Sequence, residues 1–238
     1  MQPARANPPA SRHRFDSSSA LASALARAVA RDLRDGLAAR GAAVLAVSGG
    51  RTPERFFAAL AQQPLDWEKV SVTLVDDRWV PLDSPRSNEA LLRRSLLQGP
   101  AAAARLVGLV GAAAQPEAGL RDVTARIAAL PQPFDAVVLG MGADGHTASF
   151  FPGGDRLAEA IDPVGAAPVL PMRAAGAGEP RITLTLPLIT AARAVYLHIE
   201  GAEKAEVLER ALGGGPVEDM PVRAVLRAAP PPEIYWCP

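Results

Sequence analysis

The sequence has little of several features that define specialised classes of protein. It contains one cysteine, Cys237, so it forms neither an internal disulfide nor a cysteine-based zinc cluster, which is typical of a reducing compartment. Its 25 basic and 25 acidic side chains give a formal net charge of zero, which argues against non-specific binding to nucleic acid or anionic membranes. No apolar run reaches the roughly 18 residues that cross a bilayer. We therefore expect a cytoplasmic protein that binds neither nucleic acid nor membranes.

The composition is that of a globular domain. Hydrophobic residues make up 49% of the 238 residues and charged residues 21%, which supplies a substantial core. Residues 1–14 are rich in Pro, Ala and Arg, lack acids and show no amphipathic pattern, so we expect a disordered tail there. Residues 15–238 are then expected to form a single α/β catalytic domain.

Hydrophobic periodicity predicts helices that alternate with short apolar strands. Leucines and a valine recur at helical spacing in residues 17–40, and Gly41 follows as a helix end. Further helices are expected at 53–61, 87–97, 116–130, near Leu157, at 201–212 and at 221–227. Strands are expected at 42–47, 70–75, 106–110, 134–139, 168–172, 181–186, 194–199 and 234–236. This alternation indicates an α/β fold with a mainly parallel sheet flanked by helices.

Residues 134–149 combine a short apolar strand with a glycine-rich turn that carries an acid and an imidazole. Asp144 and His146 lie in the turn itself, and Thr147 with the short residues after it is expected to open a helix. Ligands of open α/β sheets bind at the carboxyl ends of strands, so we predict that His146 is functional. The alternative is a glycine-rich connection whose histidine only caps a neighbouring segment. The glycines of the turn are Gly140, Gly142 and Gly145.

The same turn literally matches the dinucleotide fingerprint GxGxxG at residues 140–145. That fingerprint needs a second strand that ends in an acid about 20 residues further on. Asp162 lies near that position, but residues 155–161 are not a strand-like apolar run. The pattern therefore argues against nucleotide binding, and no cofactor or metal is expected.

A second strand end carries a possible anion site. Glycines and hydroxyls precede Pro53, which suits the first turn of a helix, and free N–H groups at a helix start bind anions. The alternative is an ordinary turn that caps the next helix, but a cap does not require this many glycines and hydroxyl residues in a row. The predicted phosphate cradle consists of Ser48, Gly49, Gly50, Arg51 and Thr52.

A third strand end carries the adjacent carboxylates Asp76 and Asp77. Such neighbours repel unless another group neutralises them, and Arg78 is the expected partner. The alternative is a solvated acidic turn with a salt bridge. Ser87 or Asn88 is expected to cap the helix that follows.

Two cations further along the chain are candidate ligands of an anion. Lys204 near a helix start is unfavourable with the helix dipole, and a bound phosphate would remove that objection. Arg181 begins a strand and faces either the site or the solvent. The alternative for Lys204 is an ordinary surface lysine. His198, inside a strand pattern, is expected to be packed in the core, and His13 lies in the tail, so neither is assigned to the site.

Several stretches together resemble the 6-phosphogluconolactonase family, within the superfamily of glucosamine- and galactosamine-6-phosphate isomerases. They cover most of the chain in the family's order: SGGRTP (48–53), DDRWVP (76–81), SN (87–88), GMGADGHTASFFP (140–152), RIT (181–183) and GAEK (201–204). In related deaminases and isomerases the segment after the histidine continues towards Asn-Glu-Pro with a catalytic carboxylate. Here Phe150-Phe151-Pro152 stands in that place, which favours the lactonase.

The resemblance implies a Rossmann-like, sugar-phosphate-isomerase-like fold and a cytosolic enzyme that needs no metal or nucleotide. The expected substrate is 6-phospho-D-glucono-1,5-lactone, which water opens to 6-phosphogluconate. We expect His146 to be the general base, Asp144 to orient it and backbone N–H groups to stabilise the oxyanion. The 48–52 loop would hold the phosphate. The charged residues expected around the substrate are Arg78, Lys204, Asp76 and, more weakly, Arg181.

We expect the chain to act as a monomer on a small sugar-phosphate lactone. Two other functions remain open at this point. One is a glucosamine-6-phosphate deaminase or isomerase on the same scaffold, which the missing acid after His146 disfavours. The other is a sugar-phosphate binder without activity, which the histidine at the strand end disfavours.

Overall fold

The structure is a computed structural model that describes residues 10–238. Short 3-10 helices lie at Trp67–Lys69 and Gly99–Ala103. The α-helices are α1 (Ser18–Arg40), α2 (Glu54–Ala61), α3 (Asn88–Ser95), α4 (Pro116–Ala128), α5 (Leu157–Ala160), α6 (Leu186–Thr190), α7 (Ala202–Leu212) and α8 (Val222–Leu226). The strands are β1 (Arg12–Arg14), β2 (Ala43–Val47), β3 (Val70–Leu74), β4 (Asp76–Arg78), β5 (Arg105–Val107), β6 (Ala136–Leu139), β7 (Val169–Met172), β8 (Arg181–Leu184), β9 (Ala194–Glu200) and β10 (Glu233–Cys237).

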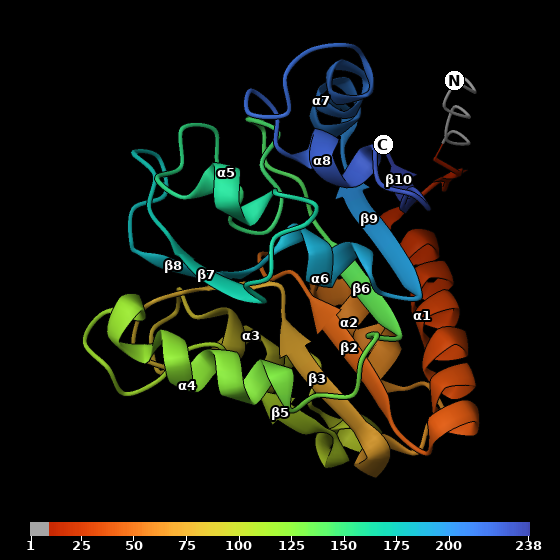
Figure 1. Cartoon of the computed structure of the whole chain (residues 1–238). Helices are drawn as coiled ribbons and strands as arrows, with labels where there is room; N and C mark the ends of the chain where they lie inside the picture. Colours follow the sequence, from red (N-terminus) through yellow and green to blue (C-terminus); the bar gives the residue numbers. More distant parts are fainter. Residues whose placement is uncertain (1–9) are drawn as a thin grey trace, which may run out of the picture.

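The main sheet has seven strands in the order β1-β10-β9-β6-β2-β3-β5, and every neighbouring pair is parallel (Figure 1). The strands β2 and β6 in its centre are buried along their whole length, as expected of a parallel sheet that helices cover. The predicted α/β fold with a mainly parallel sheet is confirmed. The carboxyl ends of β2, β6 and β9 lie side by side at one edge, because β6 pairs with both neighbours.

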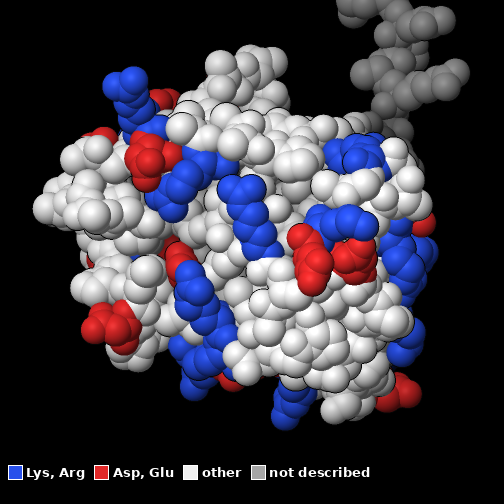
Figure 2. Space-filling model, turned by 90° about the horizontal axis from the view of Figure 1, so that it is seen from below, with Lys and Arg blue, Asp and Glu red and all other residues white. Residues whose placement is uncertain are grey.

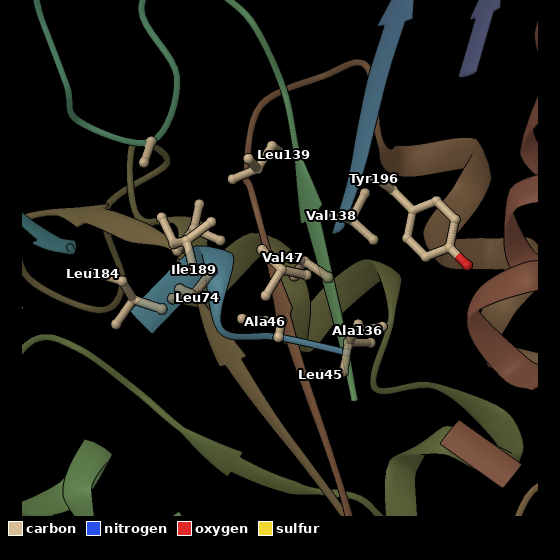
Figure 3. Packing of buried hydrophobic residues seen from close by; sticks show 14 of the residues in the cluster. Leu45, Ala46, Val47, Leu74, Ala136, Val138, Leu139, Leu184, Ile189 and Tyr196 are labelled. Carbon is tan, nitrogen blue, oxygen red and sulfur yellow. The ribbon is translucent and has the colours of Figure 1, made fainter. Parts of the chain in front are cut away.

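A second sheet, which the sequence pattern did not predict, is antiparallel and has the order β4-β8-β7. Val75 joins the two sheets: its N–H donates to the Val47 carbonyl at 3.0 Å, and its carbonyl accepts from the Leu184 N–H at 2.8 Å. Leu184 and Ile189 lie beside Leu74 of the main sheet (Figure 3). All four residues of β8 are therefore buried, whereas its alternating pattern had predicted a half-buried strand.

The ends of helix α1 are set by residues that are close to it in the sequence. The Ser17 hydroxyl accepts from the Ala20 N–H at 3.2 Å, and Gly41 ends the helix with a φ of 72° that glycine adopts without strain. The predicted helix over residues 17–40 is thus confirmed with both caps. Tyr196 of β9 points towards this helix (Figure 3), and its hydroxyl lies 2.5 Å from Asp32.

Two expectations about the chain's course need correction. Residues 12–14 are not part of a disordered tail, because β1 pairs in parallel with β10 and so extends the sheet. The tail prediction for residues 1–9 lies outside the described residues. Thr147 does not open a helix: residues 147–150 form a tight turn closed by a bridge between Thr147 and Phe150, and the next helix is α5.

The charged surface carries both signs. On the face seen from below in Figure 2, basic side chains lie in separate places with uncharged surface between them, and acidic side chains lie close to several of them. This face therefore has no continuous basic patch of the kind that binds a nucleic-acid backbone. Within residues 10–238, no helix combines the length and the apolar character that crossing a membrane requires.

Candidate active site

The carboxyl edge of the main sheet and the neighbouring small sheet enclose one cavity of about 360 Å³. That volume is of the size that small-molecule sites have. Its walls come from the segments after β2, β6 and β9 and from β4 and β8. Eleven of the predicted site residues line it: Ser48, Gly49, Gly50, Thr52, Asp76, Arg78, Gly140, Gly142, His146, Arg181 and Lys204.

Three predicted residues do not line this cavity. Arg51 lines a more open neighbouring depression instead, together with Thr52, Arg55 and Glu200. Asp144 contacts His146 without forming a wall. Gly145 lies next to Met220 and has a φ of 80°, so its contribution is the shape of the turn.

His146 and Asp144 form a hydrogen-bonded pair within the turn that follows β6. The Nδ1 atom of His146 lies 2.6 Å from Oδ1 of Asp144, and the same oxygen accepts from the His146 backbone N–H at 3.1 Å. The hydrogen bond from His146 lowers the pKa of Asp144 to about 2, so the carboxylate is ionised at neutral pH. An ionised Asp144 accepts the Nδ1 proton and leaves the Nε2 lone pair of a neutral imidazole free.

The backbone of the turn is held on both sides of the pair. The Gly142 N–H donates to the His146 carbonyl at 2.8 Å, and Thr147 Oγ1 donates to the Gly140 carbonyl at 2.8 Å. The Gly140 N–H donates to the Ser48 hydroxyl at 3.1 Å, which ties this turn to the loop after β2. Ala148 has a φ of 48°, in the left-handed region that few residues other than glycine adopt.

Gly142→Ala is expected to disrupt the pair. A Cβ atom on Gly142 would lie 2.1 Å from His146 Nδ1 and 2.5 Å from Asp144 Oδ1, well inside contact distance. We expect kcat for the reaction proposed below to fall roughly 10-fold or more, because small displacements of a catalytic group are costly. Gly140→Ala is the matched control, since its Cβ would meet nothing closer than Ser48 Cβ at 3.9 Å. Steady-state kinetics of both variants check this, and equal rates for the two would contradict it.

The prediction that Arg78 neutralises the adjacent carboxylates is wrong. Asp77 is fully buried and accepts instead from the backbone N–H groups of Arg78, Asn88 and Glu89 at 2.8, 2.8 and 3.0 Å. Burial raises the pKa of Asp77 to about 6, although these donors oppose the shift. Asp76 Oδ2 accepts from the Ser149 hydroxyl at 2.6 Å. Within residues 10–238, Arg78 forms no ion pair with either aspartate, so its charge is available to the cavity.

Arg78 and Arg181 present two unpaired guanidinium groups to the cavity. They are direct partners in the antiparallel register of β4 and β8. Each donates once, to the Arg86 and Ala177 carbonyls at 2.7 and 2.6 Å, and each has a buried Nε without a partner in the described part of the chain. Burial lowers the pKa of Arg181, and the neighbouring Arg78 adds to this shift while the charge of Asp76 opposes it. Two like charges side by side with orphan donors favour an anionic ligand between them.

Lys204 of α7 completes the set of cations around the cavity. It lies in the first turn of its helix and forms no ion pair within residues 10–238. The loop over residues 48–52 faces the same cavity, and α2 begins directly after it at Glu54, one residue later than the prediction that placed Pro53 in its first turn. The cavity wall therefore combines backbone and hydroxyl donors with three cationic side chains.

Sequence reasoning did not assign twelve further residues that line the cavity, and four of them are described here. Asn88 was predicted only as one of two possible caps of α3. The Ser87 hydroxyl has that role instead, because it accepts from the Ala90 N–H at 3.1 Å. Phe151 packs its ring 4.6 Å from the His146 ring and 5.5 Å from the Arg181 guanidinium. The other two are His198 and Glu200 of β9. His198 lay inside the predicted strand over 194–199, which indicated burial, and Glu200 lay just beyond it. Nothing local showed that the face they share meets a cavity.

No group of three or more His, Cys, Asp or Glu side chains within residues 10–238 is placed to hold a metal ion. The literal GxGxxG match likewise lacks its structural context. Residues 155–161 contain the short helix α5 and no second strand that ends in an acid. The chemistry of the cavity therefore rests on the imidazole–carboxylate pair, the cations and the backbone donors.

Comparison with known proteins places this fold and site in one class. A family model described as glucosamine-6-phosphate isomerases/6-phosphogluconolactonase matches residues 16–236. The chain belongs to this family. It is 53% identical over 230 residues to a protein of Rhizobium meliloti named 6-phosphogluconolactonase, an alignment that covers 96% of this chain and 99% of the relative. A relative of the same name from Pseudomonas putida is 42% identical over 95% of this chain and 92% of its own.

Solved structures agree with the family. The crystal structure of a 6-phosphogluconolactonase from Shewanella baltica superimposes with a TM-score of 0.93 at 40% identity, and covers 96% of this chain and 98% of that one. A monomeric glucosamine-6-phosphate deaminase superimposes with a TM-score of 0.74 at 20% identity, over 95% of this chain and 96% of that one. The second likeness shows a shared fold alone. The predicted family and its Rossmann-like fold are confirmed.

Proposed function

We propose that this chain is a lactone hydrolase that converts 6-phospho-D-glucono-1,5-lactone to 6-phospho-D-gluconate, in the oxidative branch of the pentose phosphate pathway. The observation that carries the proposal is the His146–Asp144 pair on a cavity wall that also carries unpaired cations. Two relatives that are 53% identical to this chain over 96% and 92% of its length bear the name of that activity. The pair supplies a base for water, and the cations supply a site for a phosphorylated substrate.

We assign the first step to His146. Its Nε2 accepts a proton from a water molecule as the water oxygen attacks C1 of the lactone. The ionised Asp144 fixes the tautomer and stabilises the imidazolium that forms. The carbonyl oxygen gains negative charge at this stage, and we assign its stabilisation to backbone N–H groups of the glycine turn and to Arg78.

The second step breaks the bond between C1 and the ring oxygen. The tetrahedral intermediate collapses, and the imidazolium of His146 returns its proton to the leaving ring oxygen, which becomes a hydroxyl. The product carboxylic acid loses its proton at neutral pH, so each turnover releases one proton. No covalent intermediate is needed, and Cys237 is buried in β10 away from the cavity lining.

We assign the phosphate of the substrate to the loop over residues 48–52, with Lys204 and Arg181 supplying charge. Thr52 offers a hydroxyl, and Gly49 and Gly50 bring the backbone to the cavity wall. Asn88 explains the need for glycine at position 49, because a Cβ there would lie 2.0 Å from Asn88 Oδ1. Asp76 shapes this wall through its hydrogen bond from Ser149.

The remaining parts of the proposal concern the setting of the enzyme. We propose that residues 15–238 form one catalytic domain, that the chain acts as a cytoplasmic monomer, and that the reaction needs no metal or cofactor. The substrate is a small molecule, and neither nucleic acid nor membrane is a partner.

The test is proton release from freshly made 6-phosphogluconolactone at near-neutral pH. The lactone also opens unaided, so the quantity measured is the rate above a blank without enzyme. We expect saturable acceleration by the purified chain. A folded chain that gives no acceleration, but forms a ketose phosphate from glucosamine 6-phosphate, would overturn the lactonase in favour of the isomerase.

A further inference from the structure

His198 and Glu200 form a second imidazole–carboxylate pair at the cavity, on a different strand from the first. Both lie on one face of β9, two residues apart, as alternation along a strand requires. The Nε2 atom of His198 lies 2.9 Å from Glu200 Oε1, and Glu200 Oε2 accepts from the Ser18 hydroxyl at 2.6 Å. Both carboxylate oxygens are thus engaged, which fixes the imidazole ring in one orientation.

His198 of this pair is buried, and only one of its two ring nitrogens forms a hydrogen bond within residues 10–238. The His198 residue is 3% exposed and lines the cavity. Its other ring nitrogen, Nδ1, has no hydrogen-bond partner among residues 10–238, and it is not among the fully buried side-chain atoms that lack one. An imidazole fixed at one nitrogen and open at the other, in a residue that lines the cavity, can bind a ligand there through the open nitrogen.

Three contacts locate His198 beside the loop over residues 48–52. Its ring packs edge-on against Phe56, in the first turn of α2, at 6.2 Å between centroids. Glu200 also lines the neighbouring depression together with Thr52. Lys204 follows Glu200 on α7 and lines the main cavity. This corner of the cavity therefore collects a hydroxyl, backbone donors, an amine and an imidazole, all suited to one anion.

The carboxylate beside His198 fixes how the imidazole faces the cavity. The hydrogen bonds from His198 and Ser18 lower the pKa of Glu200, so this carboxylate is ionised. An ionised Glu200 accepts the Nε2 proton and leaves Nδ1 for a ligand in the cavity. We propose that His198, held by Glu200, donates a hydrogen bond from Nδ1 to the phosphate of the substrate, and that Glu200 is a positioning residue for it. This inference rests on the proposed lactonase function.

The kinetic test compares His198→Gln with the wild type in the lactone assay. Loss of a hydrogen bond to a charged group is expected to raise KM roughly 10–100-fold. The value of kcat should stay within about threefold, because His198 takes no part in proton transfer from water. Glu200→Gln should raise KM in the same direction by a smaller factor. The matched control is His13→Gln. His13 lies on β1 and pairs with Glu233 of β10, and it does not line the cavity, so this variant should leave both constants unchanged.

A binding test separates this inference from the lactonase itself. The chain has three histidines, so their ring proton NMR signals can be assigned by single replacements. Inorganic phosphate is expected to shift the signal of His198 in a saturable way and to leave that of His13 in place. This readout needs no turnover, and a wild type without lactonase activity that still shows the shift would count against the reaction only.

Two results would overturn the inference. One is an unshifted His198 signal at phosphate concentrations that inhibit the wild-type enzyme. The other is a folded His198→Gln protein with an unchanged KM, or one in which kcat alone falls. Thermal unfolding of each variant tests whether it is folded. If a single variant does not fold, the double variant His198→Gln with Glu200→Gln, which lacks both ionisable groups, replaces it.

Discussion

Replacing His146 by alanine is expected to lower kcat for lactone hydrolysis by roughly 10²–10⁴-fold, the range that a general base contributes. The Nε2 atom of this residue is the free nitrogen of the Asp144 pair on the cavity wall. Its loss leaves the loop over residues 48–52 and the cations in place, so we expect KM to change only a few-fold. Steady-state proton release at near-neutral pH measures both constants.

The control for this variant is Asp144→Asn, which keeps the size of the side chain and removes its charge. The amide nitrogen can donate to Nδ1 and so favour the tautomer that carries its proton on Nε2, which cannot accept a proton from water. We expect a large fall in kcat here as well, with a folded protein. Near wild-type turnover of His146→Ala would contradict the assignment of His146 as the base, whatever result Asp144→Asn gives.

The largest expected effect on stability is at Asp135, which precedes β6 at the end remote from the cavity. This side chain is fully buried and accepts two hydrogen bonds of 2.6 Å from Arg40 and one of 2.8 Å from the Val44 N–H. Gly36 of α1 packs so closely that a Cβ there would lie 2.2 Å from Asp135 Oδ1. The ion pair therefore fastens α1 to the two central strands.

Asp135→Ala is expected to lower the free energy of unfolding by about 3–5 kcal/mol, because Arg40 then loses its partner in a poorly solvated place. Urea unfolding measures the change. The matched control is Glu209→Ala, which breaks an exposed pair with Arg12 and should cost at most about 1 kcal/mol. Folded Asp135→Ala protein should retain its turnover number. A loss no larger than that of Glu209→Ala would contradict the role given to this pair.

The parts of the fold that the sequence predicted are those that depend on neighbours along the chain. Helix α1 follows from its periodic leucines and from Ser17 and Gly41, which act within a few residues. Asp144 and His146 share one turn, so their proximity was available from spacing. Thr147 was misjudged because small residues favour several conformations, and the left-handed Ala148 is set by the packing of the turn.

The remaining features depend on contacts between segments far apart in sequence. Strand β1 has three residues and no pattern of its own, and it exists because β10 offers a sheet edge. The unpaired state of Arg78 depends on β8, which places Arg181 opposite it, and on backbone donors that occupy Asp77. His198 has the sequence pattern of a core residue, and its place at the cavity depends on the packing of β9 against Phe56 of α2.

The cavity lies between the two sheets, and the groups that we assign to the substrate come from both. Arg78 and Arg181 belong to strands of the small antiparallel sheet, whereas Lys204 and the loop over residues 48–52 follow strands β9 and β2 of the main one. A phosphosugar held as we propose would contact both sheets across their junction at Val75, so a shift of one sheet against the other would change its affinity. The His146–Asp144 pair lies wholly within one turn and moves as a unit. Substitutions at the junction of the two sheets are therefore expected to change which sugar phosphates bind, while the His146–Asp144 pair stays in place.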